Sequence, residues 1–201
     1  GPNTGGMGTI SPNPFYTEEV AKRCMEAIFQ PTVEAMNAEG RPFKGCLYFG
    51  LMLTKDGPKV IEYNSRFGDP ETQVVLPRLK TDFAQIVEAV AHERLGELSI
   101  QWDDRACACV VMASGGYPGS YPKGLEIYGL DAGGQASGVT VYHAGTKCED
   151  GKFLTNGGRV LGITALGDTL EEALNQAYAG VEKISFEGAM YRKDIGRTHR
   201  N

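Results

Sequence analysis

No stretch of this 201-residue sequence is long and apolar enough to cross a membrane, and no signal peptide is visible. Basic residues are not in excess, since 20 Lys and Arg stand against 25 Asp and Glu, a net charge of −5. This balance argues against a protein dominated by nucleic-acid binding. The three histidines have no partner at catalytic spacing, so we expect structural or solvent-exposed roles for His92, His143 and His199.

The number and spacing of the cysteines argue against two kinds of site. There are five cysteines, an odd count, and no two of them form a CxxC pair. This pattern argues against a disulfide framework or a zinc site and favours a reducing, cytoplasmic location. Cys107 and Cys109 alternate with alanines ahead of an apolar run, so we expect both to be buried and inert in a strand.

The content of hydrophobic and charged residues is that of a globular protein. Hydrophobic residues make up 41% of the sequence and charged residues 22%, which is enough for one domain or two small ones. The 27 glycines gather in short runs without a period. Such runs indicate turns and places where the backbone approaches a ligand.

The first part of the sequence predicts a loop and then a long helix. Residues 1–14 are rich in Gly, Pro, Asn, Ser and Thr, which is typical of a loop. Thr17 is a suitable N-cap for a helix that kinks or breaks at Pro31 and ends by Gly40.

A hairpin and a second helix are expected next. Residues 44–54 are apolar on both faces, which predicts a central strand. A tight turn leads to a return strand at residues 59–65, and a functional loop runs on to about Lys80. Thr81 is then the expected cap of a helix that ends near Gly96.

The second half predicts short strands and one helix. Asp168 with Glu171 and Thr169 with Glu172 both have capping-box spacing, so we place the start of that helix at Asp168 or Thr169. We place a boundary near residue 98, which gives an α+β protein with domains 1–97 and 98–201. The expected strands of the second domain are 106–112, 126–128, 139–144, 152–154 and 159–166.

The most informative stretch is residues 60–73, in which Glu62 and Asn64 lie two positions apart on the expected return strand. Side chains alternate faces along a strand, so these two point the same way, within reach of one ion. Their oxygens are hard ligands that suit Mg²⁺ or Mn²⁺. The same spacing is also usual on a solvated strand face, so the pair alone leaves both interpretations open.

Charged residues follow this pair. Arg66 stays on the same face if the strand persists, where it can anchor a phosphate or form a salt bridge with Asp69 or Glu71. Asp69 and Glu71 can bind a substrate amine or ribose hydroxyls, or orient Arg66. Further on, Arg159 can reach a substrate phosphate or pair locally.

The start of the chain carries a glycine-rich loop, Asn-Thr-Gly-Gly-Met-Gly at residues 3–8. Its backbone N–H groups can approach an anion without obstruction by a Cβ atom. The loop lacks the Lys and the spacing of a P-loop, so nucleotide binding does not follow from it alone.

Several motifs together resemble one family. Residues 1–8, residues 60–73 and the Ser-Gly-Gly-Tyr-Pro-Gly run at 114–119 resemble, in this order, the glycinamide ribonucleotide synthetases (phosphoribosylamine–glycine ligases) of the ATP-grasp superfamily. The resemblance continues to residues 191–196. It implies the C-terminal lobe of an ATP-grasp domain, an antiparallel sheet with helices, followed by a small, mostly-β domain with one helix. It also implies that this chain is only the C-terminal part of the enzyme.

The resemblance also implies a reaction, the ATP-dependent ligation of glycine to an amine. ATP, glycine and 5-phosphoribosylamine give glycinamide ribonucleotide, ADP and phosphate through a glycyl phosphate. Glu62 and Asn64 match the family's metal-liganding pair, for Mg²⁺ or Mn²⁺. Many ATP-grasp enzymes have another acidic ligand on the preceding strand, which here reads Phe-Gly-Leu-Met at 49–52. The implied catalytic residues are Arg66 and Asp69, and the implied cofactor-binding residues are Asn3, Thr4, Gly5, Gly6, Gly8 and Arg66.

Two alternatives are weighed against this hypothesis: another ATP-grasp carboxylate–amine ligase or carboxylase, and a non-catalytic binding module. The Arg-Phe-Gly-Asp-Pro-Glu run at 66–71 favours the glycine ligase. The adenine-binding hinge and the phosphate-gripping Lys are expected in a missing N-terminal part. The isolated chain is therefore predicted not to catalyse ligation.

Overall fold

The computed structural model describes residues 1–197, so His199 lies outside the described residues. The chain packs into two compact units. The β-sheet unit contains residues 1–11, 69–78 and 103 onward, and the helix–hairpin unit contains residues 12–68 and 79–102. The units are defined by packing and interleave along the chain, so the boundary near residue 98 stays a prediction.

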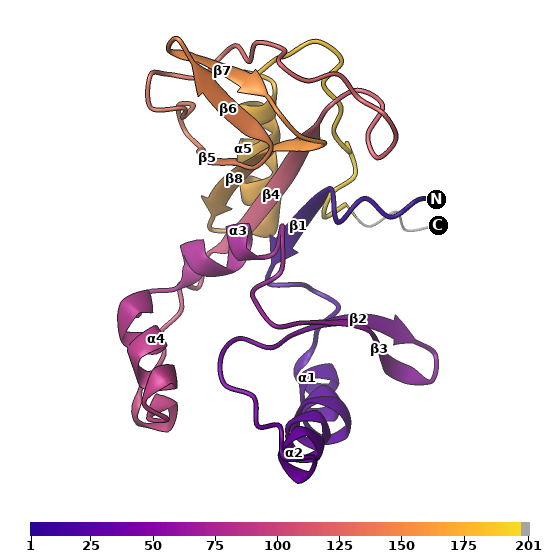
Figure 1. Cartoon of the computed structure of the whole chain (residues 1–201). Helices are drawn as coiled ribbons and strands as arrows, with labels where there is room; N and C mark the ends of the chain where they lie inside the picture. The colour runs from indigo at the N-terminus through magenta and orange to yellow at the C-terminus, as the bar shows by residue number, and fades with distance from the viewer. Residues whose placement is uncertain (198–201) are drawn as a thin grey trace. The chain divides into compact units, whose positions relative to one another are not determined.

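A four-stranded antiparallel sheet forms the centre of the β-sheet unit (Figure 1). Its strands, in spatial order, are β1 (Gly8–Ser11), β4 (Ala106–Ala113), β8 (Arg159–Gly167) and β5 (Thr140–His143). The expectation that residues 1–14 form a loop is wrong at β1. This strand is too short to show an alternating pattern, and it forms by pairing with β4, about a hundred residues away in sequence.

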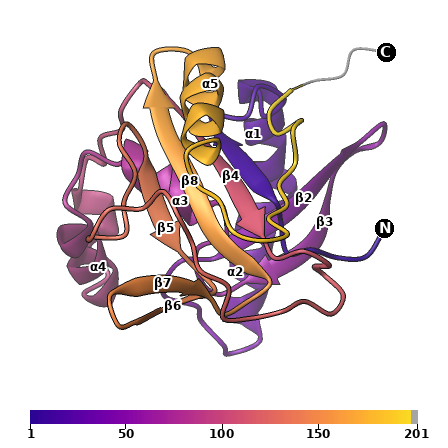
Figure 2. The same cartoon turned by 90° about the horizontal axis from the view of Figure 1, so that it is seen from above.

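Strand β4 is buried along its whole length because both faces of the sheet are covered. Alternate residues from Ala106 to Met112 join a core that also includes Leu161 and Ile163 of β8. Helix α5 (Leu170–Val181) contacts both β4 and β8 and supplies Ala177 and Val181 to that core (Figure 2).

The opposite face of β4 packs against a short helix. Cys107, Cys109 and Val111 form a second core with Val74 of helix α3 (Thr72–Val75). The predicted burial of the two cysteines is confirmed, and burial raises the pKa of Cys109 to about 12. The thiols at these positions are thus neutral packing groups.

Local signals in the sequence located α5 well. Thr169 is its N-cap, with Oγ1 accepting from the N–H of Glu172 at 3.1 Å. The Glu172 carboxylate accepts in return from the N–H of Asp168 at 3.0 Å. Of the two predicted capping boxes, the one of Thr169 and Glu172 is therefore confirmed, although the return bond goes to the N–H of Asp168 rather than to that of Thr169.

The other strands of this unit were predicted less completely. Strand β7 (Lys152–Thr155) pairs with β6 (Thr146–Glu149), which the sequence did not predict. The expected strand at 126–128 forms isolated bridges only, from Glu126 to Leu154 and from Tyr128 to Ser185.

The helix–hairpin unit begins with one continuous helical rod. It consists of α1 (Glu18–Cys24), a π-helical turn η1 (Met25–Phe29) and α2 (Gln30–Ala38). Thr17 caps it as predicted, with Oγ1 accepting from the N–H of Val20. The helix continues through Pro31, which lacks an N–H, and the wider π-helical turn ends at Phe29, two residues before it.

The hairpin is formed by β2 (Tyr48–Thr54) and β3 (Gly57–Asn64). The rod packs on it through rings, with Phe29 and Phe49 centroids 4.5 Å apart. Among the described residues β2 pairs with β3 alone, and Met52 is 54% exposed. The expectation of a central strand is therefore wrong for β2. An apolar pattern on both faces indicates that a strand is covered, but it does not show that the strand has a partner on each side.

The rest of this unit is helical. Helix α4 (Phe83–Ala91) is capped by Asp82, whose carboxylate accepts from the N–H of Ala84 at 2.8 Å. Thr81, the predicted cap, instead accepts from the N–H of Gln101. The 3₁₀ turn η3 (Leu95–Glu97) also lies in this unit, whereas the 3₁₀ turn η2 (Leu76–Arg78) lies in the β-sheet unit. Within the described residues no helix has the length and apolarity needed to span a membrane.

Candidate active site

Glu62 and Asn64 lie side by side near the end of β3. The Asn64 Nδ2 atom donates to Glu62 Oε1 at 3.3 Å, which places both side chains on one face of the hairpin. Glu62 is exposed and Asn64 is half-buried. The predicted placement of the pair is confirmed, while its role as a metal-liganding pair stays a prediction.

The neighbouring strand leaves room for the Glu62 side chain. Gly50 of β2 is the register partner of Glu62. A Cβ atom at Gly50 would lie 2.8 Å from Glu62 Cγ, closer than such atoms approach in proteins. The absence of a side chain at this position therefore lets the Glu62 carboxylate lie across β2, where the sequence offers no second acid.

This donor set fits a hard divalent cation. One carboxylate and one amide oxygen can face the same ion once the Asn64 amide turns its oxygen outward, a rotation that exchanges its O and N positions. Among residues 1–197, no group of three or more His, Cys, Asp and Glu side chains gathers as a metal site. The pair thus offers two oxygen donors to such a cation.

Arg66 lies beyond the end of the strand. Strand β3 ends at Asn64, so strand alternation does not extend to Arg66 and does not place it on the face of Glu62 and Asn64. Its Nη1 donates to the carbonyl of Phe67 at 2.8 Å, and the side chain is exposed. The structure therefore shows an exposed cation close in sequence to the pair, held by one bond to its neighbour.

A second cluster, in the β-sheet unit, centres on Arg159 at the start of β8. Its Nη1 donates to three carbonyls: Gly5 at 2.8 Å, Gly6 at 3.3 Å and Asp69 at 3.0 Å. Its Nη2 donates to Asp69 Oδ2 at 2.9 Å. Arg159 was expected either to reach a substrate phosphate or to pair locally. In the structure it pairs within the protein, but with partners that are distant in sequence.

Asp69 is fixed from both sides. Its second carboxylate oxygen accepts from Gln73 Nε2 at 2.9 Å, while the first accepts from Arg159. Neither contact could be predicted from the spacing of residues along the chain. Asp69 and Arg159 are ninety positions apart, and only the pairing of the strands brings such segments together.

The glycine-rich loop is held by its carbonyls. Tyr117 donates its hydroxyl to the Thr4 carbonyl at 2.6 Å, and Arg159 bonds the next two carbonyls. Gly6 has a φ of 93°, and a Cβ atom there would lie 2.7 Å from Cδ of Pro70. Glycine at this position is therefore required both by conformation and by the close approach of the 69–70 segment.

The two other predicted loop residues, Asn3 and Gly8, also have defined places. Asn3 Oδ1 accepts from the N–H of Gly5 at 2.9 Å, which tightens the loop from within. Gly8 begins β1, where a Cβ atom would lie 2.7 Å from the Cys109 carbonyl. The loop residues predicted to bind a cofactor thus form one ordered segment, anchored on β4 and β8.

Two histidines and the tail have structural roles within the described residues. The His143 ring bonds Thr146 Oγ1 at 2.9 Å and the Gly134 carbonyl at 2.8 Å, while His92 is the C-cap of α4. Arg192 pairs with Asp194, and the Arg192 carbonyl accepts from Tyr178. The bond from Tyr178 ties the tail to α5, and the ion pair lies within the tail itself.

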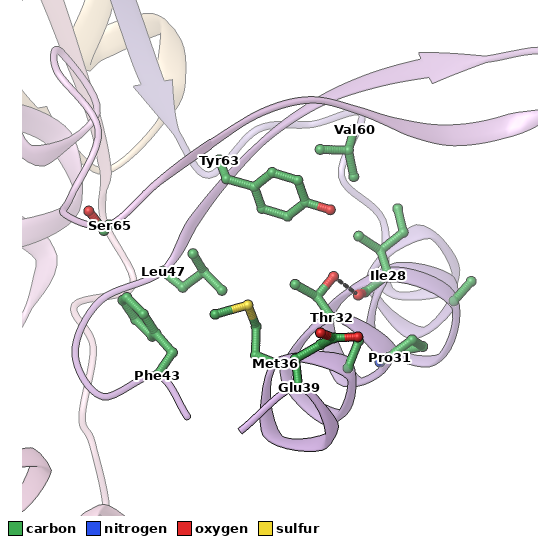
Figure 3. Close-up of a pocket in the computed structure, with 12 residues that line it drawn as sticks. Ile28, Pro31, Thr32, Met36, Glu39, Phe43, Leu47, Val60, Tyr63 and Ser65 are labelled. Carbon is green, nitrogen blue, oxygen red and sulfur yellow. Dashed lines mark hydrogen bonds between the residues drawn. The ribbon is translucent and has the colours of Figure 1, made fainter. Parts of the chain in front are cut away.

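A separate cavity of about 750 Å³ lies within the helix–hairpin unit (Figure 3). Tyr63 and Val60 of β3 face Ile28, Pro31 and Met36 of the helical rod across it. Its lining is largely apolar and does not include Glu62 or Asn64. The two faces of the hairpin therefore differ, one apolar toward the helix and one bearing the polar pair.

Two family models match the sequence of this chain. The family described as "Phosphoribosylglycinamide synthetase, ATP-grasp (A) domain" matches residues 1–72, and "Phosphoribosylglycinamide synthetase, C domain" matches residues 107–198. The chain belongs to the phosphoribosylglycinamide synthetase family. The two matches include the Glu62–Asn64 pair, the glycine-rich loop and Arg159.

Individual relatives agree with this family. The chain is 56% identical to a phosphoribosylamine–glycine ligase of Caldanaerobacter subterraneus, covering 97% of this chain and 46% of the relative. It is 53% identical to the trifunctional purine biosynthetic protein adenosine-3 of Gallus gallus, covering 98% and 20%. The chain thus spans about half the length of the bacterial ligase it matches.

Solved structures support the same fold. A phosphoribosylamine–glycine ligase from Thermotoga maritima matches with a TM-score of 0.80 and 38% identity, covering 97% of this chain and 47% of that one. The biotin carboxylase domain of a Hydrogenobacter thermophilus 2-oxoglutarate carboxylase matches with a TM-score of 0.61 at 16% identity, covering 94% and 43%. The second likeness shows the fold alone. The predicted α+β fold of the ATP-grasp type is confirmed.

Proposed function

We propose that this chain is part of an ATP-dependent ligase that joins glycine to 5-phosphoribosylamine. The products are glycinamide ribonucleotide, ADP and phosphate, formed through a glycyl phosphate intermediate. The observation that carries the proposal is the Glu62–Asn64 pair, two adjacent oxygen donors 3.3 Å apart within a chain of this family. The names of the relatives support the choice of substrates.

The chemistry requires activation of a poor electrophile. A carboxylate resists attack by an amine, and its phosphorylation creates a leaving group that the amine can displace. Glu62 and Asn64 would hold Mg²⁺ or Mn²⁺, and such a cation would offset the negative charge that builds up in phosphoryl transfer. The fit rests on the hard oxygen donors and on the space above Gly50.

The remaining residues would bind and orient anions. Arg66, an exposed guanidinium with donors to spare, would anchor the transferred phosphate or a substrate carboxylate. The loop at residues 3–8 would present backbone N–H groups to a phosphoryl oxygen. Asp69, engaged with Arg159 and Gln73, would act through the position of these loops.

The partners of this chain follow from the same proposal. We infer ATP as co-substrate. The Hydrogenobacter neighbour is described as a complex with MgADP and bicarbonate, which supports a nucleotide and a divalent cation for this fold. Because the chain spans about half of its bacterial relatives, the rest of the site would come from further chain of the same enzyme. A purine-synthesising enzyme of this kind would work in the cytoplasm.

The alternatives differ in which acid is phosphorylated by ATP and which nucleophile then attacks it. Another ATP-grasp ligase or carboxylase would use a different acid or amine, and a binding module would use none. The experiment is a panel of assays on the full-length enzyme containing this chain, with ATP, 5-phosphoribosylamine and glycine. Bicarbonate and other amino acids replace glycine in parallel, and product is identified by mass spectrometry.

We expect glycinamide ribonucleotide and ADP in equal amounts with glycine, and neither product with bicarbonate. The isolated 201-residue chain serves as a second sample and is expected to form no product. Carboxyphosphate-dependent chemistry with bicarbonate, or an absence of any ATP-dependent product, would overturn the proposal. Turnover by the isolated chain at the full-length rate would overturn the need for the rest of the enzyme.

A further inference from the structure

The guanidinium of Arg159 joins two segments that are far apart in sequence. Its side chain is only 20% exposed and contacts the carbonyls of Gly5 and Gly6 and both the carbonyl and the carboxylate of Asp69. Three of these four acceptors are backbone atoms. Arg159 therefore holds both segments mainly through their backbone carbonyls.

These bonds set the direction of the peptide groups in the loop. The carbonyls of Thr4, Gly5 and Gly6 all accept from Tyr117 or Arg159. In a trans peptide the N–H of the next residue points opposite to the carbonyl. The N–H groups of Gly6 and Met7 therefore point away from Arg159, and that of Gly5 is already bonded to Asn3.

Direct binding of a phosphate by Arg159 does not fit this arrangement. The cavity beside it, lined by Asp69, Gln73 and residues of β4 and β8, has a volume of about 10 Å³. Such a space is no larger than one water molecule requires. A phosphate would also have to displace the Asp69 carboxylate from a charge-assisted bond of 2.9 Å.

We propose that Arg159 is a positioning residue for ligation. By holding the Gly5 and Gly6 carbonyls and the Asp69 segment, it fixes the loop so that the N–H groups of Gly6 and Met7 face a phosphoryl group of the reactants. This inference rests on the proposed function. It assigns to Arg159 a role distinct from binding the substrate itself, and it makes Tyr117 a second support of the same loop.

The test uses steady-state ligation by the full-length enzyme and its Arg159→Ala, Arg159→Lys and Tyr117→Phe variants, and a double variant. Misplacing a reacting group by about 1 Å can cost about 100-fold in rate. We therefore expect Arg159→Ala to lower kcat about 100-fold, with KM for ATP within about twofold. Tyr117→Phe should lower kcat about fivefold, and the double variant should match Arg159→Ala, because both bonds hold one loop.

The control is Arg105→Ala, which removes a comparable ion pair to Asp103 in the same unit. Its kcat should stay within about twofold of the wild-type value. Arg159→Lys should recover part of kcat, since an ammonium can still donate to the carbonyls. Should Arg159→Ala fail to fold, Asp69→Asn keeps the shape of the cluster with a weaker bond, and a roughly tenfold lower kcat is expected.

Distinct outcomes would overturn the inference. An Arg159→Ala enzyme with a kcat within twofold of wild type would remove the positioning role. A higher KM for 5-phosphoribosylamine at unchanged kcat, additive with Tyr117→Phe, would make Arg159 a direct substrate ligand. A loss of thermal stability with normal kcat would make it structural only. The proposed function itself fails in a different way, through a wild-type enzyme that does not ligate glycine.

Discussion

Gly158 is the position at which a single methyl group should disturb the loop network most clearly. It lies just before β8, beneath the Tyr117 ring, and a Cβ atom there would lie 2.1 Å from Cδ2 and 2.3 Å from Cε2 of that ring. Ordinary contact begins at 3.4 Å, so the ring must move by roughly 1.3 Å. The hydroxyl would then lose its 2.6 Å bond to the Thr4 carbonyl.

The cost can be worked from these contacts. A lost hydrogen bond is worth about 1 kcal/mol, and overpacking adds about 1–3 kcal/mol. We expect Gly158→Ala to lower the free energy of unfolding by about 2–4 kcal/mol, and Tyr117→Phe, which loses only the bond, by about 1 kcal/mol. The assay is urea unfolding of this chain followed by fluorescence and circular dichroism.

A matched glycine supplies the control. A Cβ atom at Gly96 would meet nothing within 4 Å. Gly96→Ala should therefore change the free energy of unfolding by less than about 0.5 kcal/mol. If Gly158→Ala were as mild as Gly96→Ala, the Tyr117 ring could not lie where the structure places it, and the support of the loop by Tyr117 would be refuted.

Three further predictions concern stability and the thiols. Thr169→Ala removes the cap bond to the Glu172 N–H and should cost about 1 kcal/mol in urea unfolding; no change would refute the cap. Because burial raises the pKa of Cys109 to about 12, its thiol stays neutral when folded and ionises first in the unfolded chain. The stability that the neutral thiol contributes is complete below about pH 9 and is lost toward pH 12, at up to about 1.4 kcal/mol per pH unit. The free energy of unfolding of Cys109→Ala should therefore fall less steeply with pH over this range than that of the wild type. Equal slopes for the two proteins would contradict the prediction. A maleimide at pH 7 should modify exposed Cys148 in the folded chain and Cys107 only after unfolding, as read by mass spectrometry; labelling of folded Cys107 would contradict its burial.

Features governed by neighbouring residues could be predicted from the sequence. The caps at Thr17 and Thr169 are local hydrogen bonds between residues three positions apart. The side-by-side placement of Glu62 and Asn64 follows from strand alternation alone, and it needs no knowledge of what the strand pairs with. Local geometry therefore sufficed to predict that these two side chains lie side by side.

Features governed by distant pairing could not be predicted. Strand β1 exists because β4 offers it a partner, and its four residues carry no alternating signal. The contact between Asp69 and Arg159 depends on the same sheet, so sequence spacing suggested Arg66 as the nearer partner. Asp82 rather than Thr81 caps α4 because the Thr81 hydroxyl is engaged by the Gln101 N–H.

Metal affinity of the full-length enzyme tests the central claim most directly. Mn²⁺ binding in the presence of ADP would be measured by calorimetry for wild type, Glu62→Gln and the control Glu88→Gln, whose side chain is an exposed partner of Arg94. Glu62 is exposed and accepts one 3.3 Å bond, so its variant should unfold within about 0.5 kcal/mol of wild type. We expect Glu62→Gln to weaken Mn²⁺ binding at least about tenfold and ligation about 100-fold, with Glu88→Gln unchanged. A folded Glu62→Gln enzyme that binds Mn²⁺ and ligates glycine as wild type does would contradict the account.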